Sequence, residues 1–353
     1  MSKAKNIEYY DPSIILSKKD LDGLVPSIYI VTTNRSAGKT TSFLKMIAEE
    51  YINNKKEFCL IYRYKYELSD SYKLFDDLFK IYPELGGEMK AESIAEGLIY
   101  KITYNNEQMG FAVALSNVDN VKKYSPLFAN VQFCLMDEYQ TESGKYLANE
   151  VKKFQSMLMT ISRGGGSQSR NIKVFLLGNL VTIMNPYLIA FDIHKRLREG
   201  TKFIRGTGWV AEFGFNKAAS DAIKNNRLFA GFKDDSYIKY STENVYLHDA
   251  TAFIEKPKGA FKYICTIVQD GQKFGVRSYW EQGIVYINKK PDNNFKYVIT
   301  FKNGDHNQNT VMLNHYSWVW KNIKDAYFNG ALRFDDMKTK SVIFDILAVD
   351  IYK

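Results

Sequence analysis

The sequence predicts an α/β domain built on a mostly parallel sheet, followed by a smaller α+β domain. Up to about Arg205, strand-like and helix-like segments alternate, which is typical of a parallel sheet covered by helices on both faces. After Ala252, apolar strand-like runs instead follow one another directly. The length of 353 residues is sufficient for two such domains.

The first domain is expected to span residues 1–205. Its apolar runs predict strands, and its helical periodicities predict helices. Strands are expected at 27–32, 57–64, 98–103, 110–115, 131–136 and 173–177, and helices at 40–51, 69–82 and 147–161. The strands at 98–103 and 110–115 are expected to form a hairpin.

Residues 206–250 are glycine-spaced and weakly periodic, so they are predicted to be a linker or lid with one short helix. The second domain, at 251–353, begins with the strand-like runs AFIEK, FKYICTIVQ, KFGVRSYW, GIVYINKK and KYVITFK. The QDGQ at 269–272 predicts a hairpin turn. Helical patterns near 318–329 and 341–352 complete this domain.

Composition narrows the class of protein. A formal charge of +9 and an isoelectric point near 9.1 favour a polyanionic partner, although a generally basic protein would look the same. Cys59, Cys134 and Cys265 each lie in an apolar run, as buried thiols of a reducing compartment do. The four histidines lack ligand spacing, which argues against a structural metal site. No apolar run reaches the roughly 20 residues of a membrane span, so an intracellular protein without a membrane partner is expected.

The stretch VTTNRSAGKTT at 31–41 ends as a phosphate-binding loop ends, in Gly38, Lys39 and Thr40. Thr33 stands where the pattern G-x-x-x-x-G-K-[ST] has its first glycine. An apolar strand nevertheless leads in and a helix follows, which is the setting that a phosphate cradle needs. The alternative is an ordinary helix start. The expected nucleotide contacts in the cradle are Thr33, Asn34, Arg35, Ser36, Ala37, Gly38, Lys39, Thr40 and Thr41.

A second motif supports the cradle. The stretch VQFCLMDEY is an apolar strand that ends in Asp137 and Glu138. In P-loop ATPases an aspartate at this strand end helps to hold Mg²⁺, and a neighbouring glutamate can activate the attacking water. A solvated acidic pair is the alternative for this motif alone. Both motifs together predict a nucleotide site in which Lys39 and Thr40 contact phosphate and Thr40 and Asp137 hold the metal.

Three further residues fit such a site. Arg163 and Arg170 flank the glycine-rich turn in ISRGGGSQSR, where an arginine can reach a neighbouring subunit's phosphate or, alternatively, grip nucleic acid. Asn179 ends the next strand, VFLLGN, at a position suited to contacting the terminal phosphate or the attacking water. Strands also end in asparagine because of its turn preference.

With these motifs in place, the chain resembles the genome-packaging ATPases of phi-29-type tailed phages, relatives of terminase large subunits. The resemblance runs nearly from end to end. It rests on the order and spacing of NRSAGKT, YRYKYEL, MDE, TISR, NPYL, FIEK, GQKFGV…QGIVYI and NGALRFD.

The resemblance implies a P-loop ASCE ATPase that uses ATP and Mg²⁺ to move double-stranded DNA into a preformed capsid. It implies a homo-oligomeric ring, a pentamer in this family, docked on the capsid portal or connector or on a structural packaging RNA. Such a motor acts in the host cell cytoplasm while docked on the procapsid. Glu138 matches the catalytic glutamate and Arg163 the arginine finger that acts in trans. Arg35 matches a loop arginine, and Lys122 or Lys123 a further family lysine.

The resemblance also implies that the second domain is RNase H-like. In terminases this domain is a nuclease with an acidic cluster on two metal ions. Here the strand FKYICTIV carries no carboxylate and Asp270 lies in the predicted turn, so a vestigial nuclease without activity is expected. The remaining acids are Asp325, Asp335, Asp336, Asp345 and Asp350.

DNA contacts are expected to be mostly to phosphates. Candidates are Arg63, Lys65 and the basic segment 194–205, for which a solvated basic face is an equal alternative. Three other functions remain open from the sequence. They are a helicase or branch-migration ATPase with the same ATP site, a DNA-binding scaffold that does not hydrolyse ATP because its loop has decayed, and a nuclease.

Overall fold

In a computed structural model of the protein, the described residues are 9–143, 145–163, 168–197, 201–228, 254–313 and 317–352. The chain divides into two compact units. The first unit comprises Met1–Leu180 and Leu197–Asn244, and the second comprises Val181–Arg196 and Val245–Lys353.

The first unit is built on a sheet to which the described residues contribute nine strands, in the order β3-β4-β5-β2-β6-β7-β1-β9-β8. The strands are β1 (Ile28–Thr33), β2 (Glu57–Tyr62), β3 (Met89–Ile94), β4 (Ile99–Tyr104), β5 (Glu107–Ala114), β6 (Val131–Met136), β7 (Lys173–Asn179), β8 (Phe203–Gly206) and β9 (Trp209–Phe213). The strands from β5 to β9 in this order pair in parallel, whereas β3, β4 and β8 pair antiparallel at the two edges. The sheet is therefore mostly parallel, as the alternation of elements predicts.

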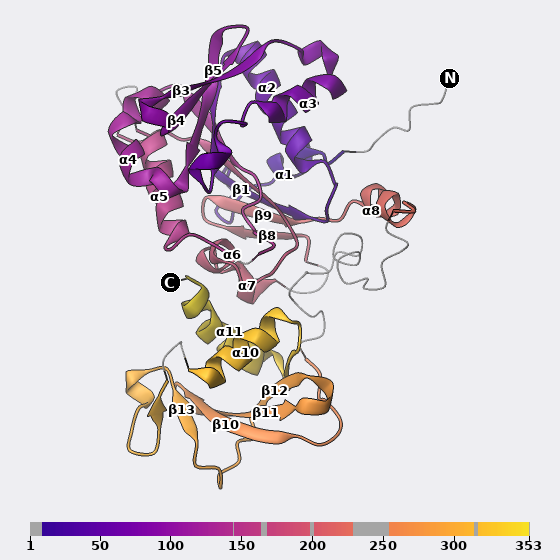
Figure 1. The fold of residues 1–353 in the computed structure, drawn as a ribbon, viewed down its shortest axis with the longest axis vertical. Coiled ribbons are helices and arrows are strands. Elements are labelled where there is room, and N and C mark those ends of the chain that lie inside the picture. The colour runs from indigo at the N-terminus through magenta and orange to yellow at the C-terminus, as the bar shows by residue number, and fades with distance from the viewer. Residues whose placement is uncertain are drawn as a thin grey trace. The chain divides into compact units, whose positions relative to one another are not determined.

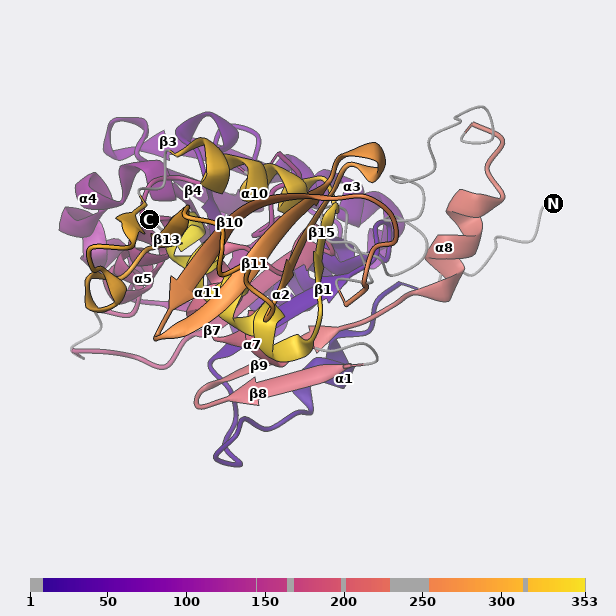
Figure 2. The same ribbon diagram turned by 90° about the horizontal axis from the view of Figure 1, so that it is seen from below.

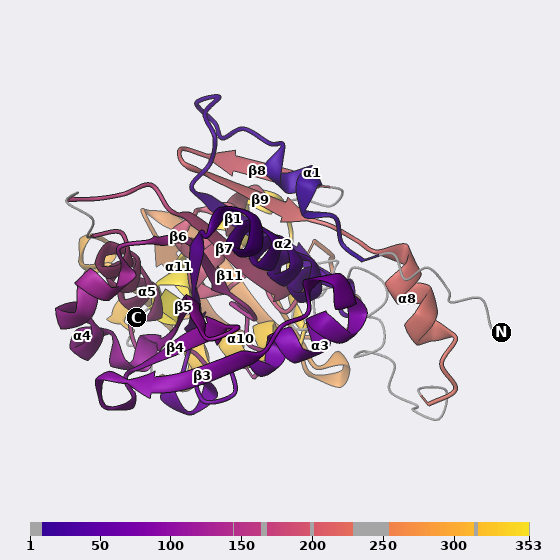
Figure 3. The same cartoon turned by 90° about the horizontal axis from the view of Figure 1, so that it is seen from above.

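Helices cover both faces of this sheet. The helices that the described residues of this unit form are α1 (Pro12–Leu16), α2 (Lys39–Asn54), α3 (Lys73–Ile81), α4 (Val118–Val121), α5 (Glu150–Ile161) and α8 (Lys217–Lys224), the last of which lies to one side of the strands (Figure 1). Figures 1 and 3 show α2 and α3 on one side of the strands and α4 and α5 on the other. Short 3-10 helices connect them: η1 (Lys65–Glu67), η2 (Pro83–Leu85), η3 (Ala95–Gly97), η4 (Leu115–Asn117) and η5 (Lys122–Phe128).

Alternation along the buried strands explains why both faces need a cover. On β1, Tyr29 and Val31 belong to the core cluster that also contains Phe43 and Ile47 of α2, whereas Ile30 between them is buried outside that cluster. The apolar residues of α2 recur at helical spacing, so a single face of this helix enters the core. Because the strands from β5 to β9 pair in parallel, their carboxyl ends all lie at one edge of the sheet, beside the start of α2.

The second unit has its own sheet, to which the described residues contribute six strands in the order β14-β13-β10-β11-β12-β15. The strands are β10 (Lys262–Gln269), β11 (Gln272–Tyr279), β12 (Ile284–Asn288), β13 (Val298–Thr300), β14 (Val311–Met312) and β15 (Leu332–Phe334). Figure 2 shows β13, β10 and β11 side by side. The helical elements are α6 (Pro186–Ala190), α7 (Ile193–Arg196), η6 (Trp280–Gln282), η7 (Asn303–Asp305), α10 (Trp318–Phe328) and α11 (Met337–Tyr352).

Both predicted hairpins are present. Strands β4 and β5 pair antiparallel across Asn105 and Asn106, and β10 and β11 pair across Asp270 and Gly271. All four turn residues have positive φ, which a tight hairpin turn requires. The sequence patterns therefore located these turns correctly.

Several segments differ from the expected elements and boundaries. Residues 206–250 are not all linker, because β9 lies beside β1 in the main sheet. The segment 181–196 lies in the second unit, where Thr182 Oγ1 and Tyr327 OH share a buried hydrogen bond of 2.7 Å. Strands β3, β8, β14 and β15 were not expected, since each is short or lacks clear alternation. Of the expected AFIEK strand, residues 252–253 lie outside the described part, and Ile254 forms only an isolated bridge to Phe334. Among the described residues, no helix combines the length and apolarity needed to cross a membrane.

Candidate active site

The loop between β1 and α2 lies at the carboxyl edge of the parallel strands. Ser36 and Gly38 have φ values of 60° and 78°, so the backbone turns sharply just before α2 begins at Lys39. A Cβ atom on Gly38 would lie 2.2 Å from the Tyr9 ring, which explains the need for glycine. Thr33, in contrast, is a buried residue of β1 whose φ is not positive. The missing first glycine of the motif therefore leaves no backbone strain at Thr33.

Lys39 is buried at the first position of α2. Its Nζ donates to Thr33 Oγ1 at 2.9 Å, to Asn179 Oδ1 at 3.0 Å and to the Asn34 carbonyl at 3.4 Å. Burial lowers the pKa of Lys39 to about 8, although the Asp137 and Glu138 carboxylates oppose this shift. All three acceptors are neutral oxygens, so the buried ammonium is suited to an anion that enters the loop.

Thr40 and Asp137 meet across the two motifs. Thr40 Oγ1 donates to Asp137 Oδ2 at 2.7 Å, and Asp137 directly follows β6. Burial raises the pKa of the Asp137 carboxyl, and the Thr40 hydrogen bond opposes that rise. A hydroxyl and a carboxylate oxygen side by side fit Mg²⁺, which commonly takes one or two carboxylates and completes its shell with phosphate and water. Among the described residues no group of three or more His, Cys, Asp or Glu could hold a metal alone.

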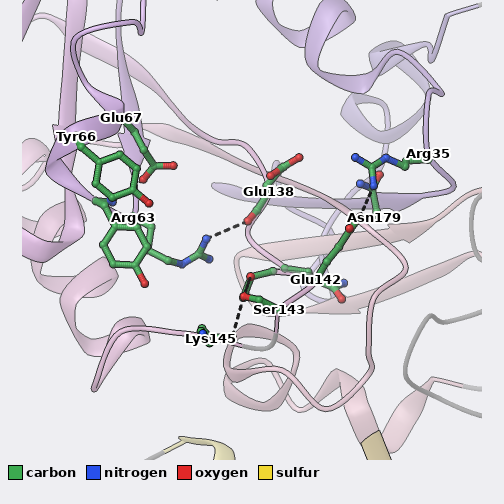
Figure 4. A pocket seen from close by; sticks show the side chains of 12 residues that line it. Arg35, Arg63, Tyr66, Glu67, Glu138, Glu142, Ser143, Lys145 and Asn179 are labelled. Carbon is green, nitrogen blue, oxygen red and sulfur yellow. Dashed lines mark hydrogen bonds and ion pairs between the residues drawn. The ribbon is translucent and has the colours of Figure 1, made fainter. Parts of the chain in front are cut away.

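Glu138 is the next residue and points into a pocket of about 490 Å³ (Figure 4). Its backbone is left-handed, with φ of 54°, and its N–H donates to Asp137 Oδ1 at 3.0 Å. Partial burial, and then the charge of Asp137, raise the pKa of Glu138. A raised carboxylate pKa is what a general base requires.

Arg63, at the end of β2, fixes the backbone around Glu138. Its guanidinium binds both carboxylate oxygens of Glu150 at 2.9–3.0 Å, and it donates to the carbonyls of Tyr139 at 3.1 Å and Glu138 at 3.5 Å. The side chain of Glu150 is fully buried and that of Arg63 is 10% exposed. These contacts hold Arg63 beside Glu138 in the pocket lining, and contact of Arg63 with DNA stays a prediction. No local pattern marks Glu150, which lies 87 residues after Arg63.

Three further residue pairs hold the loop and the strands beside it in place. Arg35 forms an ion pair with Glu142, and Asn34 exchanges hydrogen bonds with the backbone of Asn216 at 2.7 and 3.1 Å. On the β6 side, Tyr139 OH shares a buried hydrogen bond of 2.7 Å with Thr32. No local sequence pattern could have identified these partners, because tertiary folding brings them together. Of the remaining cradle residues, Ser36 is exposed, Ala37 is buried and Thr41 is half-buried.

Other predicted basic residues lie elsewhere. Arg170 donates to the carbonyls of Phe128, Val131 and Ile161 at 2.7–2.8 Å, so it closes a loop at the end of α5, and neither a finger nor a DNA contact is supported for it. Arg163 is exposed just beyond α5 and does not line the pocket.

The exposed lysines Lys65, Lys122 and Lys123 also lie outside this pocket. Lys122 pairs with Asp119 at 2.6 Å, and Lys123 Nζ lies 5.2 Å from the centre of the Tyr124 ring. In the basic segment 194–205, His194 is buried and Lys195 forms an ion pair with Asp345 at 2.6 Å. Arg205 is exposed, and Arg198 lies outside the described residues.

The acids of the second unit do not converge. Asp325 is exposed on α10, Asp270 binds Lys302, Asp345 binds Lys195 and Asp336 binds Lys289. Asp335 accepts from the backbone of Lys289 at 2.9 Å. The side chain of Asp350 lies outside the described set.

The fold and the site define a class of mixed α/β protein in which polar side chains converge at the carboxyl edge of a large, mostly parallel sheet, where such folds bind ligands. The chain belongs to the Podovirus DNA encapsidation protein (Gp16) family, whose sequence profile matches residues 4–350. The family predicted from the sequence is thereby confirmed.

The chain is similar to named relatives. It is 24% identical over 346 residues to the DNA packaging protein of Bacillus phage phi29, covering 96% of each chain. It is 24% identical over 320 residues to that of Bacillus phage B103, covering 88% of this chain and 94% of the relative.

Two solved structures share the fold. A chain of the bacteriophage Phi-29 viral genome packaging motor assembly superimposes with a TM-score of 0.56 at 22% identity, covering 98% of this chain and 100% of that one. A chain of the Phi-28 gp11 DNA packaging motor gives 0.55 at 16% identity, covering 98% of both.

Proposed function

We propose that this protein is an ATP-driven translocase that moves double-stranded DNA into a preformed phage capsid. The observation that carries the proposal is the meeting of Lys39, Thr40, Asp137, Glu138 and Asn179 at one edge of the sheet. Family membership supports DNA packaging as the process that the site drives, because the relatives are named DNA packaging proteins.

The strand order supports an ASCE-type P-loop ATPase. Strand β7, which ends in Asn179, lies between β1, which leads into the phosphate loop, and β6, which ends before Asp137. This additional strand between the two motif-bearing strands is the arrangement that defines the class. It places Asn179 between the ammonium of Lys39 and the pocket that Glu138 faces.

In the proposed mechanism Lys39 binds the terminal phosphates of ATP, and Thr40 and Asp137 hold Mg²⁺. When bound, Mg²⁺ neutralises charge on the phosphate oxygens. Glu138 takes a proton from the attacking water, and Asn179 orients that water or the terminal phosphate. Arg63 keeps the Glu138 backbone in place through its two carbonyl contacts.

Arg163 is proposed to act on a neighbouring subunit. The first residue of α5, Glu150, lies beside the site through its contact with Arg63, and Arg163 follows the other end of this helix. At 1.5 Å per residue, α5 carries the chain about 17 Å away from its own site. A head-to-tail ring would place this arginine at the next subunit's ATP.

The remaining parts of the proposal follow from the family. The ring is a pentamer on the procapsid in the host cell cytoplasm, and its partners are DNA, the capsid portal or connector and a packaging RNA. The second sheet is proposed to be RNase H-like, because β10, β11 and β12 form an antiparallel meander and β13 and β14 add in parallel beside β10. Its dispersed acids support a domain without nuclease activity.

A turnover assay with DNA tests the proposal. We expect DNA-stimulated phosphate release from the wild type and almost none from Glu138→Gln, with ATP binding retained in both. Equal, slow release from both proteins would favour a non-hydrolysing scaffold. Separation of DNA strands during turnover would favour a helicase, whereas filling of procapsids with intact duplex supports packaging.

A further inference from the structure

The residues on either side of Glu138 are tied to the two ends of the phosphate loop. Asp137 Oδ2 accepts from Thr40 Oγ1, which lies just after the loop, at 2.7 Å. Tyr139 OH shares a hydrogen bond of 2.7 Å with Thr32 Oγ1, which lies just before the loop on β1. Glu138 itself has a left-handed backbone, which is costly for a residue other than glycine and persists only where its surroundings fix it.

The Tyr139 side chain crosses the strand that separates β6 from β1. Tyr139 follows β6, Thr32 belongs to β1, and β7 lies between these two strands. Gly178 of β7 is the register partner of Thr32, and a Cβ atom on Gly178 would lie 2.8 Å from the Tyr139 ring. The ring therefore passes directly over a glycine. Neighbouring strands lie about 4.8 Å apart, so a contact across an intervening strand needs a long side chain, and tyrosine is the longest that carries a hydroxyl.

The Tyr139 hydroxyl lies in a closed polar contact. Both Tyr139 and Thr32 are fully buried, and Gln140 Nε2 donates to the same hydroxyl at 3.0 Å. A buried hydroxyl is stable only when it is hydrogen-bonded, so these contacts are kept in the folded chain. Packing over Gly178 holds the ring, and the bond to Thr32 fixes the end of β6 relative to the phosphate loop.

We propose that Tyr139 is a positioning residue for hydrolysis, whose bond to Thr32 sets the place of Glu138 relative to phosphates bound in the loop. This rests on the proposed role of Glu138 as the general base and extends it by naming the residue that holds it. Arg63 supports the same backbone by donating to the carbonyls of Glu138 and Tyr139 (Figure 4). Such support matters because a displacement of about 1 Å in a catalytic group can slow a reaction by about 10²-fold.

DNA-stimulated turnover of Tyr139→Phe tests the proposal. This variant keeps the ring over Gly178 and removes only the hydroxyl. We expect kcat to fall about three- to tenfold, the range of one lost hydrogen bond, while KM for ATP changes less than about twofold because the residues that contact phosphate are untouched. An unchanged kcat, or a rise in KM that accounts for the whole loss of kcat/KM, would overturn the inference.

The second unit offers a matched control. Tyr327 is also fully buried, and its hydroxyl shares a hydrogen bond of 2.7 Å with Thr182 Oγ1. Tyr327→Phe removes an equivalent hydrogen bond from the other unit, so kcat should stay at the wild-type value. A comparable fall of kcat in Tyr139→Phe and Tyr327→Phe would show that the Tyr139 hydroxyl contributes only stability.

Variants of Thr32 separate the hydrogen bond from the packing of the ring. Thr32→Val keeps the shape of the side chain and removes its hydroxyl, so kcat should fall as in Tyr139→Phe. Thr32→Ser keeps the hydroxyl and should retain most of the rate. The double variant Thr32→Val/Tyr139→Phe should lose no more than either single variant, because the same bond is removed. Additive losses, or slower turnover in Thr32→Ser than in Thr32→Val, contradict the positioning role.

The Glu138→Gln variant in the same assay keeps the two proposals apart. Wild-type turnover that requires Glu138, together with an unchanged rate in Tyr139→Phe, would leave the proposed function standing and overturn this inference alone.

Discussion

The two sheets of this protein use their carboxylates differently. In the first unit, Asp137, Glu138 and Glu150 gather at one edge, and burial raises the pKa of the first two. In the second unit, Asp270 and Asp336 each bind an exposed lysine. Burial at the ends of neighbouring strands shifts the pKa of a carboxylate into the range that catalysis needs. A carboxylate that forms an ion pair with an exposed lysine instead stabilises a turn or a helix end.

The strongest predicted loss of activity tests whether the carboxylates of the two units differ in function. Glu138→Gln should reduce ATP hydrolysis by about 10²- to 10⁴-fold, because the general base is lost while the geometry is kept. Asp325→Asn, in the second unit, should leave hydrolysis unchanged. Phosphate release with DNA measures both variants. A rate of phosphate release for Asp325→Asn as low as that for Glu138→Gln would show that a carboxylate of the second unit is also needed for hydrolysis.

The buried ion pair gives the next effect. Glu150→Ala removes the carboxylate that balances the charge of the buried Arg63 guanidinium, which should cost about 3–5 kcal/mol of unfolding free energy. The double variant Arg63→Met/Glu150→Met should recover part of this loss, because no charge remains unpaired. Urea unfolding of both variants is the measurement. A double variant less stable than Glu150→Ala would show that the pair is not the cause.

Asp336 supplies a smaller effect with a defined pH dependence. It caps α11 by accepting from the Thr339 N–H at 2.8 Å. The hydrogen bond from Lys289, and then this capping contact, lower the pKa of Asp336 to about 2. Because the folded pKa lies below the unfolded value, the stabilisation is present above about pH 4 and is lost as pH falls toward 2. Asp336→Asn should cost about 1 kcal/mol or less at pH 7. Thermal unfolding should show the gap between wild type and variant closing at acid pH.

The smallest effect concerns the half-exposed pair of Arg35 and Glu142. Glu142→Gln removes the ion pair that competes with the nucleotide for the Arg35 charge, so Kd for ATP should fall by about two- to fivefold, as expected for a surface ion pair worth up to about 1 kcal/mol. Titration calorimetry in low salt measures this. Weaker ATP binding in the variant would show that Glu142 holds Arg35 in its working position instead.

The local patterns in the sequence located the main elements of the first unit because their causes are local. Buried strands appear in the sequence as apolar runs. The motif Gly38, Lys39 and Thr40 predicts where α2 begins. Strand β9 was missed because its five buried residues lie in a glycine-spaced stretch, and its place in the main sheet depends on pairing with β1, which is far away in the sequence. The segment 181–196 was assigned to the first domain because nothing local marks its packing with α11.

Within the site, the motif residues and the family could be recognised from the amino-acid sequence alone, because the spacing and order of residues along the chain carry that information. The partners of the three arginines became clear only from the three-dimensional fold: Arg63 binds Glu150, Arg170 binds three carbonyls, and Arg163 is exposed. Basic residues look alike in a sequence, since their charge is the same wherever they lie. Their partners are set by which strands and helices meet, and that depends on packing over the whole unit.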